Sequence, residues 1–117
     1  MALLLLTAGF ANATWKPDYA ASPPEWIAWF RAAELTEKAR ERFPFKNCCE
    51  QADRFKTNFK VESGRWSYLK DTQWKDISDD IIHYEDDPKM PEQLKREGVL
   101  FIYRGQETCF WPPQTTG

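Results

Sequence analysis

The chain has 117 residues, which is enough for one domain of ordinary size. Its 16 basic and 18 acidic side chains give a formal net charge of -2. Because no basic excess is available to draw the chain onto a phosphate backbone, we expect no nucleic-acid partner. Aromatic residues make up 15% of the chain, too many large apolar groups for a disordered tail. The composition therefore indicates one small folded domain.

The first thirteen residues have the pattern of a secretory signal peptide. An uncharged, mainly apolar run extends from Ala2 to Ala11 and is followed by Asn12 and Ala13, which complete a small-x-small cleavage signature. No basic residue precedes the leucines, and the alternative interpretation is a buried N-terminal helix. The run is too short to span a bilayer. We expect cleavage after Ala13, a single domain over residues 14–117, and a periplasmic or secreted location without stable membrane insertion.

A long amphipathic helix is predicted from Pro23 to Phe43. Ser22 can cap its start, Pro23 suits the first helical position, and Glu25 completes a capping box. Pro44 would stop the helix. One flank is aromatic, with Trp26, Trp29 and Phe30 at helical spacing, and it is a candidate contact surface for a partner.

The next segment changes to a two-residue period, which indicates strands. Residues 54–61 alternate so that positions 55, 57, 59 and 61 face inward and the polar positions between them face water. A turn at residues 62–64 leads into a strand at 65–70, and a turn at 71–73 leads into a strand at 74–77. We expect an antiparallel meander of three strands.

After the meander, short elements lead to two more strands. Residues 78–80 can cap one turn, residues 85–88 form an acidic loop, and residues 91–97 form a helical turn closed by Gly98. Residues 99–103 are apolar at every position, which predicts a central strand covered on both faces. A last strand at 108–111 ends at two prolines. The predicted fold class is α+β: an N-terminal helix packed on an antiparallel sheet of about five strands, or on a partly closed barrel.

Three cysteines lie in the predicted mature chain, at positions 48, 49 and 109. In an oxidising compartment, Cys109 should pair with Cys49 or with Cys48, and we favour Cys49. A bond between the adjacent Cys48 and Cys49 would need strained geometry. Either long-range bridge closes a loop of about 60 residues, worth about 4 kcal/mol in the chain-entropy model. One thiol is left over, either buried or available to a second molecule.

A metal site is the sharper alternative for the same residues. Zinc accepts three Cys and one His, which here would be Cys48, Cys49, Cys109 and His83. The spacing argues against this set, because adjacent cysteines in a strand point to opposite faces. Nothing in the sequence places His83, the single histidine, near a thiol. We therefore expect no metal and no cofactor, and we keep the four-residue site as an alternative.

Catalytic motifs are absent from the sequence. It contains no glycine-rich phosphate loop, no G-x-S-x-G and no H-E-x-x-H. The acidic residues near position 85 lack the spaced oxygen ligands and the turn glycine of a calcium-binding EF-hand loop. We therefore expect that the protein is not an enzyme.

Four aromatic residues on the predicted strands form a second candidate binding surface. They are Trp66, Tyr68, Trp74 and Trp111, all close to turns. Such side chains can stack on sugar rings or on an extended peptide, and they are also what a small sheet uses to build its core. We expect at least half of them to be core.

Three stretches of the chain resemble a group of small secreted proteins of alphaproteobacteria and their phages. They are the C-C-E-Q-A-D stretch at residues 48–53, the W-K-D-I-S-D-D-I-I-H stretch at 74–83 and the G-Q-E-T-C-F-W-P-P stretch at 105–113. Ser78 stands where proline is common in that group. The resemblance covers about residues 47–113 and implies export and a disulfide between the double-cysteine segment and the last strand. It implies no activity.

The main functional hypothesis is a non-catalytic secreted or periplasmic domain that binds a protein or another component of the cell envelope. A metal or redox protein that uses the three cysteines and His83 is the alternative from a different class. A cell-envelope inhibitor or a virion accessory protein is a third option.

Overall fold

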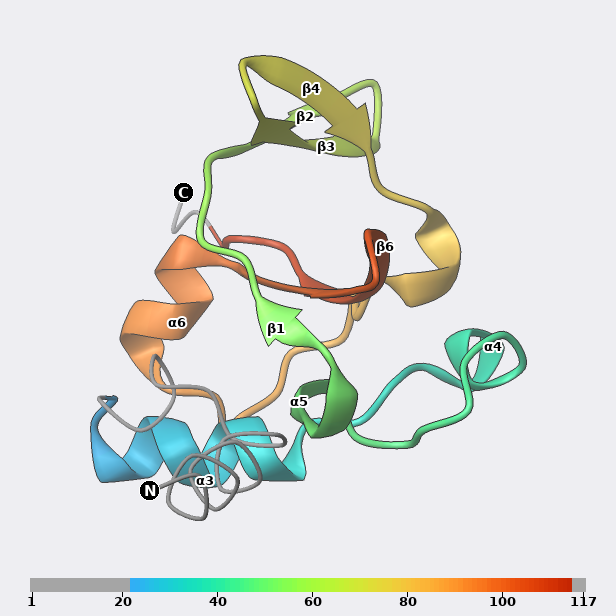
Figure 1. The fold of residues 1–117 in the computed structure, drawn as a ribbon. Coiled ribbons are helices and arrows are strands. Elements are labelled where there is room, and N and C mark those ends of the chain that lie inside the picture. The colour runs from blue at the N-terminus through green and yellow to red at the C-terminus, as the bar shows by residue number, and fades with distance from the viewer. Residues whose placement is uncertain (1–21, 115–117) are drawn as a thin grey trace, which may run out of the picture.

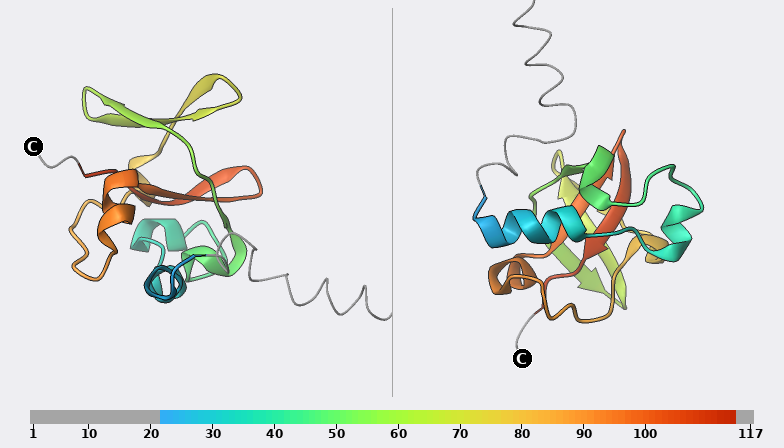
Figure 2. Two further views of the ribbon diagram at one scale, coloured as in Figure 1. Left: turned by 90° about the vertical axis from the view of Figure 1, so that its left-hand side faces the viewer. Right: turned by 90° about the horizontal axis from the view of Figure 1, so that it is seen from below.

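The protein is organised in three layers in its computed structural model, which describes residues 22–114 (Figure 1). Helices form the lowest layer, one small sheet forms the middle layer, and a second small sheet lies above it (Figure 2). The helical elements are α3 (Pro24–Ala32), α4 (Glu37–Arg40), α5 (Cys48–Gln51), the 3-10 turn η1 (Asp79–Ile81) and α6 (Glu92–Glu97). The strands are β1 (Asp53–Arg54), β2 (Phe59–Glu62), β3 (Arg65–Lys70), β4 (Gln73–Asp76), β5 (Val99–Tyr103) and β6 (Gln106–Trp111).

The middle sheet has the order β1-β5-β6, and both pairings are antiparallel. The prediction of a central strand at residues 99–103 is confirmed, because β5 lies between the other two and its first three residues are fully buried. Phe101 packs edge-to-face against Phe30 of α3, on the helical side of the sheet. On the other side, Phe110 contacts Phe59 and Trp66 of the upper sheet. The middle sheet is therefore covered on both faces.

The upper sheet is the predicted three-stranded meander, with the order β2-β3-β4. Its tight turns use left-handed backbone conformations at Ser63 and Gly64 and again at Asp71 and Thr72. Consecutive residues with positive φ are typical of the two-residue hairpin turns that match the twist of the flanking strands. The bounds of β3 agree with the prediction, and β4 is displaced by one residue toward the N-terminus.

The single strand predicted over residues 54–61 is wrong, because the structure has two separate strands there, β1 and β2. The chain pairs with β5 through Asp53 and Arg54, and Phe55 N–H donates to the Leu100 carbonyl at 2.8 Å. It then crosses between the layers and starts β2 at Phe59. Phe59 does face the core, but Val61 is exposed and the side chain of Arg54 is buried against Glu97. The single five-stranded sheet and the barrel are therefore wrong, and two three-stranded sheets stand in their place. The alternating pattern extends across the crossing and conceals it.

The predicted helix over residues 23–43 is also corrected. α3 ends at Ala32, because Ala33 has an extended backbone and the next residues pair with the segment before α5. Leu35 N–H donates to the Lys46 carbonyl at 2.9 Å, and Cys48 N–H donates to the Ala33 carbonyl at 2.9 Å. The helix resumes only as the single turn α4. The start of α3 is also displaced by one residue, since the N-cap position is Pro23 and the first helical residue is Pro24.

The predictions for the short elements after the meander are confirmed. The Ser78 hydroxyl accepts a hydrogen bond from Asp80 N–H and caps η1. α6 ends at Gly98, whose φ of 77° is typical of glycine. Within residues 22–114, no helix has the length and apolarity that crossing a membrane would require. The predicted signal peptide, residues 1–13, lies outside the described part of the chain.

Candidate functional site: the Cys48–Cys109 disulfide and His83

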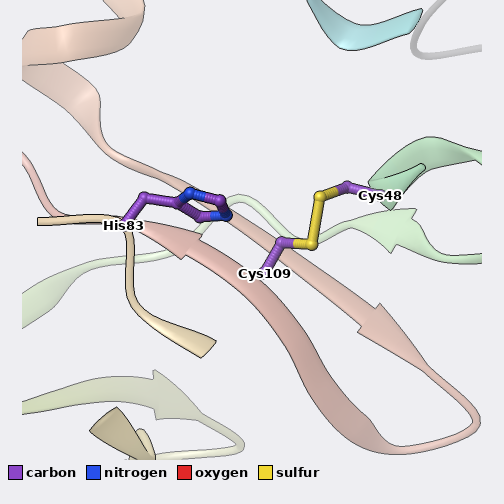
Figure 3. A group of neighbouring side chains, drawn as sticks. All are labelled: Cys48, His83 and Cys109. Atoms are coloured by element: carbon purple, nitrogen blue, oxygen red, sulfur yellow. A yellow bond between two sulfur atoms is a disulfide. The ribbon is translucent and has the colours of Figure 1, made fainter. Parts of the chain in front are cut away.

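A disulfide joins Cys48, at the start of α5, to Cys109 on β6 (Figure 3). Both residues are fully buried, and their Cα atoms are 6.1 Å apart. This is the second of the two pairings that the sequence allows, and the favoured Cys49–Cys109 pairing is wrong. The bridge ties the helical layer to the last strand across 61 positions of the chain.

Cys49 is a buried free thiol on the same short helix. Because successive side chains of a helix point in different directions, the side chain of Cys49 points away from β6. Its Sγ donates to the Phe30 carbonyl at 3.1 Å. Burial raises the pKa of the Cys49 thiol, so its reactive thiolate form is disfavoured. Cys49 therefore acts as a packed side chain of the core.

His83 is held against β6 by its own backbone and by its ring. Its N–H donates to the Phe110 carbonyl at 2.8 Å, and Ile82 forms a parallel bridge with Phe110. The imidazole stacks on the indole of Trp111, with ring centres 4.0 Å apart and planes 2° apart. Because Cys109 and Trp111 are two residues apart on one strand, they share a face of the sheet. The stack therefore brings the imidazole beside the disulfide.

The environment of His83 keeps its ring neutral. Burial lowers its pKa to about 4, against the opposing effects of a hydrogen bond to the Glu34 backbone and of the Asp87 carboxylate. Nε2 is buried and has no hydrogen-bond partner in the described part of the chain. A neutral imidazole carries one ring hydrogen and one lone pair, and the unpartnered Nε2 is free to present that lone pair. Figure 3 shows that the ring nitrogen farther from the backbone points toward the disulfide.

The structure thus brings together three of the four residues considered as metal ligands. The sulfurs of Cys48 and Cys109 and one nitrogen of His83 lie within 4.8 Å of one another (Figure 3). Cys49 is not part of this group, because its thiol is turned toward Phe30. The proximity of His83 to the cysteines had no sequence signal. It depends on a backbone hydrogen bond between segments 27 positions apart, from His83 to Phe110.

A hollow of about 460 Å³ opens beside His83. Its lining residues come from the start of α4 and from the acidic loop: Thr36, Ile82, His83, Tyr84, Glu85, Asp86, Asp87 and Pro88. The loop is tied to α3, because the Trp29 indole N–H donates to an Asp87 carboxylate oxygen at 2.9 Å. It is also tied to α6 through Lys95 and Asp86, whose charged atoms are 3.3 Å apart. The sequence did not indicate these anchoring roles of the acidic loop.

The predicted aromatic contact surfaces are mostly core. Trp29 and Phe30 are buried, so the helix flank is not the exposed surface that the sequence suggested. Tyr68 and Trp111 are also buried, while Trp26 and Trp66 are partly buried against the core. The expectation that at least half of the strand aromatics belong to the core is therefore confirmed. Trp74 differs from the others, since 43% of its surface is exposed.

Trp74 lies on the outer face of the upper sheet. Directly paired residues share a face of the sheet, and Trp74 pairs with Leu69 on β3. Ser67, two residues before Leu69, lies on the same face and pairs with Lys60 on β2. The Lys60 ammonium lies 4.5 Å from the centre of the Trp74 ring. The opposite face carries Tyr68, whose hydroxyl donates to Glu107 of β6 at 2.5 Å. The inner face thus fastens the meander to the core, and the outer face is left to solvent.

The comparisons with known proteins return no relative. No family model matches the chain, and neither a curated protein nor a solved structure shows significant similarity to it.

Proposed function

We propose that this chain is an exported, non-catalytic interaction domain that binds an extended segment of a protein partner at the outer face and free edge of the upper sheet. Two features support export. The start of the sequence has the apolar run and cleavage signature of a signal peptide, and a disulfide of this kind is stable in oxidising compartments.

The exposed indole of Trp74 is the observation that carries the proposal. Tryptophan is enriched among the residues that dominate binding energy, and such residues are surrounded by polar groups that exclude water. Around Trp74, the polar groups already form pairs with each other. Arg65 and Asp76 are 3.5 Å apart, and Ser67 donates to Asp76 at 3.1 Å. A partner can therefore cover the indole without leaving an unpaired charge beneath it.

β4 offers a backbone edge beside this indole. In the part of the chain that the structure describes, β4 pairs only with β3, and all four of its residues are exposed. An unpaired edge is a template for an added strand from another chain. A partner segment that extends along β4 would form backbone hydrogen bonds there and place its alternate side chains over Trp74.

A polar hollow at the end of β4 suggests the chemistry of the partner segment. It has a volume of about 460 Å³, and its lining includes Arg65 and the carboxylates of Asp76, Asp79 and Glu107. Asp76 is paired with Arg65, and Glu107 is paired with Lys75 at 3.7 Å. The carboxylate of Asp79, which accepts a hydrogen bond from the neutral Tyr84 hydroxyl, is therefore the group that favours a cation. The partner segment should therefore carry a lysine or arginine beyond the apolar residue that covers Trp74.

Selection from a displayed library of random peptides tests this proposal. The oxidised domain should select peptides with alternating apolar residues and a basic residue, and these peptides should shift the amide resonances of β4. Trp74→Ser should weaken their binding by about 30-fold, which corresponds to the loss of about 2 kcal/mol. Val61→Ser is the matched control, because Val61 is also exposed, at 48%, but pairs with Trp66 on the opposite face of the same sheet.

The outcomes separate the alternatives. Asp79→Asn should reduce the preference for basic peptides without abolishing binding. Two outcomes would overturn the proposed surface. The selected peptides could bind equally well to Trp74→Ser, or the wild type could select no more peptides than Trp74→Ser does. Export is tested separately by the intact mass of protein recovered from a periplasm, for which we expect a chain that begins at Thr14.

A further inference from the structure

Nε2 of His83 is a buried polar atom that the fold leaves without a hydrogen-bond partner among residues 22–114. Burying an unsatisfied acceptor is unfavourable. The ring is held in place by its stack on Trp111. Nε2 is aimed at two cysteine sulfur atoms, and these three atoms are of the types that bind metal ions (Figure 3).

We propose that the domain binds one zinc ion through Cys48, His83 and Cys109 when the Cys48–Cys109 disulfide is reduced. A dithiol reductant supplies two electrons and two protons, so that the S–S bond breaks, two thiols form, and the reductant becomes a disulfide. Zinc then displaces both thiol protons and bonds to two thiolate sulfurs and to the Nε2 lone pair. In the oxidised protein, neither sulfur is a thiolate, and the site does not bind.

The donor set fits zinc in type, distance and charge. Zinc binds thiolate at about 2.3 Å and imidazole at about 2.0–2.1 Å, which places tetrahedral ligand atoms roughly 3.5–4 Å from one another. The His83 nitrogen lies within 4.8 Å of both sulfurs, and reduction of the disulfide frees the two sulfurs to move apart to this spacing. Two thiolates and a neutral imidazole balance the charge of a divalent ion, which a buried site requires. Copper(I) accepts the same ligands but would leave a net negative charge.

The hollow beside His83 borders the cluster on one side, but neither Cys48 nor Cys109 lines it, so an ion that enters there must pass the imidazole. Glu85 and Asp86 line it, and their carboxylates raise the local concentration of cations at its mouth. Three protein ligands leave the fourth tetrahedral position for water from this hollow. The site therefore combines a buried pair of sulfurs with a histidine that borders solvent-accessible space.

Cys49 provides an internal control for this inference. It is adjacent to Cys48 in sequence, but its thiol donates to the Phe30 carbonyl and lies outside the cluster. A nonspecific chelate of the adjacent cysteines would need Cys49, whereas the proposed site does not. Cys49→Ser therefore distinguishes the folded site from metal capture by an unfolded chain.

The experiment is a cobalt titration of the full chain. The purified oxidised protein is reduced with dithiothreitol without oxygen, the reductant is removed by desalting, and cobalt(II) is added while the thiolate-to-cobalt charge-transfer absorption is recorded. Zinc is then added to displace the cobalt. The same titration is made on the oxidised protein and on reduced Cys49→Ser, Cys109→Ser and His83→Phe, with circular dichroism of each sample. Phenylalanine retains a ring to stack on Trp111 and removes the nitrogen donor.

We expect one ion per chain in the reduced wild type and in reduced Cys49→Ser, and none in the oxidised protein. His83→Phe and Cys109→Ser should weaken metal binding by more than about tenfold. Removal of a residue that only hydrogen-bonds to a metal ligand already weakens binding by about that factor, and these two variants remove a ligand itself. Absence of binding to the reduced wild type, whether it is folded or unfolded, would overturn the proposal. Binding that survives His83→Phe unchanged, or that is lost in Cys49→Ser, would overturn it as well.

Discussion

The two sheets have the same number of strands, but different interactions specify them. The middle sheet pairs β1 with β5 across more than 40 positions of sequence, and both of its faces are covered. The upper sheet is formed by successive strands joined by two-residue turns, and only its inner face is covered. The middle sheet adds a distant strand and the disulfide to its local β5–β6 hairpin, whereas the upper sheet depends on local turns throughout. We expect the upper sheet to open more readily than the middle one.

The same contrast separates the two proposed sites. The cluster of Cys48, His83 and Cys109 lies beneath the middle sheet, where any change also disturbs the core. The surface around Trp74 lies on the outside of the upper sheet, where a substitution removes few contacts. Variants of the buried cluster should therefore alter stability strongly, and variants of the outer face should alter binding with little effect on stability.

Removal of the disulfide should have the largest effect on stability. Cys109→Ala opens the bridge over 61 positions, and the chain-entropy model then predicts a loss of about 4 kcal/mol in the free energy of unfolding. Urea denaturation of the oxidised wild type and of the variant measures this loss. Because the domain is small, the variant should be only marginally folded.

Cys49→Ala is the control for that prediction. It also removes a buried sulfur, but no bridge, so it should cost about 1 kcal/mol through lost packing. Equal losses for the two variants would show that the disulfide does not stabilise the layers beyond its packing.

The second-largest expected effect is a fall in the free energy of unfolding on acidification, through His83. The unfolded chain protonates His83 near its ordinary pKa of 6.5, while in the folded protein burial holds the pKa at about 4. Between these values, the unfolded state binds more protons, so the free energy of unfolding falls as the pH falls. The contribution is fully present above about pH 6.5, and its loss by pH 4 amounts to about 3 kcal/mol.

His83→Phe isolates this effect from the titration of the carboxylates. Urea midpoints of the oxidised wild type and the variant are measured at several pH values from 7 to 4, and the wild-type midpoint should fall relative to that of the variant as the pH falls. Parallel curves for the two proteins would mean that His83 becomes protonated in the folded state without cost.

A pair of glycines compares the two regions at the same positive φ, and Gly98 differs in having an extended ψ of 154°. Gly98 and Gly64 both have a φ of 77°, but a Cβ at Gly98 would lie 2.7 Å from Cδ of Pro113, whereas a Cβ at Gly64 would meet no atom within 4 Å. Gly64→Ala should cost about 1 kcal/mol for the left-handed backbone alone. Gly98→Ala should cost about 2 kcal/mol more, because its neighbours must move. Thermal unfolding of both variants measures the difference, and equal losses would contradict it.

The local elements were predictable, and the crossing between the layers was not. The turn at Gly64, the apolar strand at residues 99–103 and the stop at Gly98 each follow from signals within a few residues. The break after Ala32 has no such signal, because it depends on pairing with residues 46–48. The strand expected over residues 54–61 divides between two sheets while its alternating pattern continues, so periodicity alone cannot reveal the division.

The candidate site shows the same division between local and distant signals. The sequence limited the partner of Cys109 to two residues, but the choice depends on the rotation of α5 against β6. The spacing argument against a four-residue metal site assumed a strand, whereas Cys48 and Cys49 lie on α5, and the helix is what turns their two sulfurs apart. The position of His83 was missed, because the stack on Trp111 follows from tertiary packing that no local pattern encodes.

Trp74→Ser should have the smallest effect on stability of the changes considered. The indole lies on the outer face, and its defined ring contact is with the Lys60 ammonium, so we expect the free energy of unfolding to change by no more than about 1 kcal/mol. Tyr68→Phe, on the inner face of the same sheet, removes the hydroxyl that binds Glu107 and should cost about 1–2 kcal/mol. Hydrogen exchange of the β3 amides should accelerate in Tyr68→Phe and stay near the wild-type rate in Trp74→Ser. If Trp74→Ser instead released these amides, Trp74 would be part of what holds the sheet together, and a loss of peptide binding in that variant would no longer identify a contact surface.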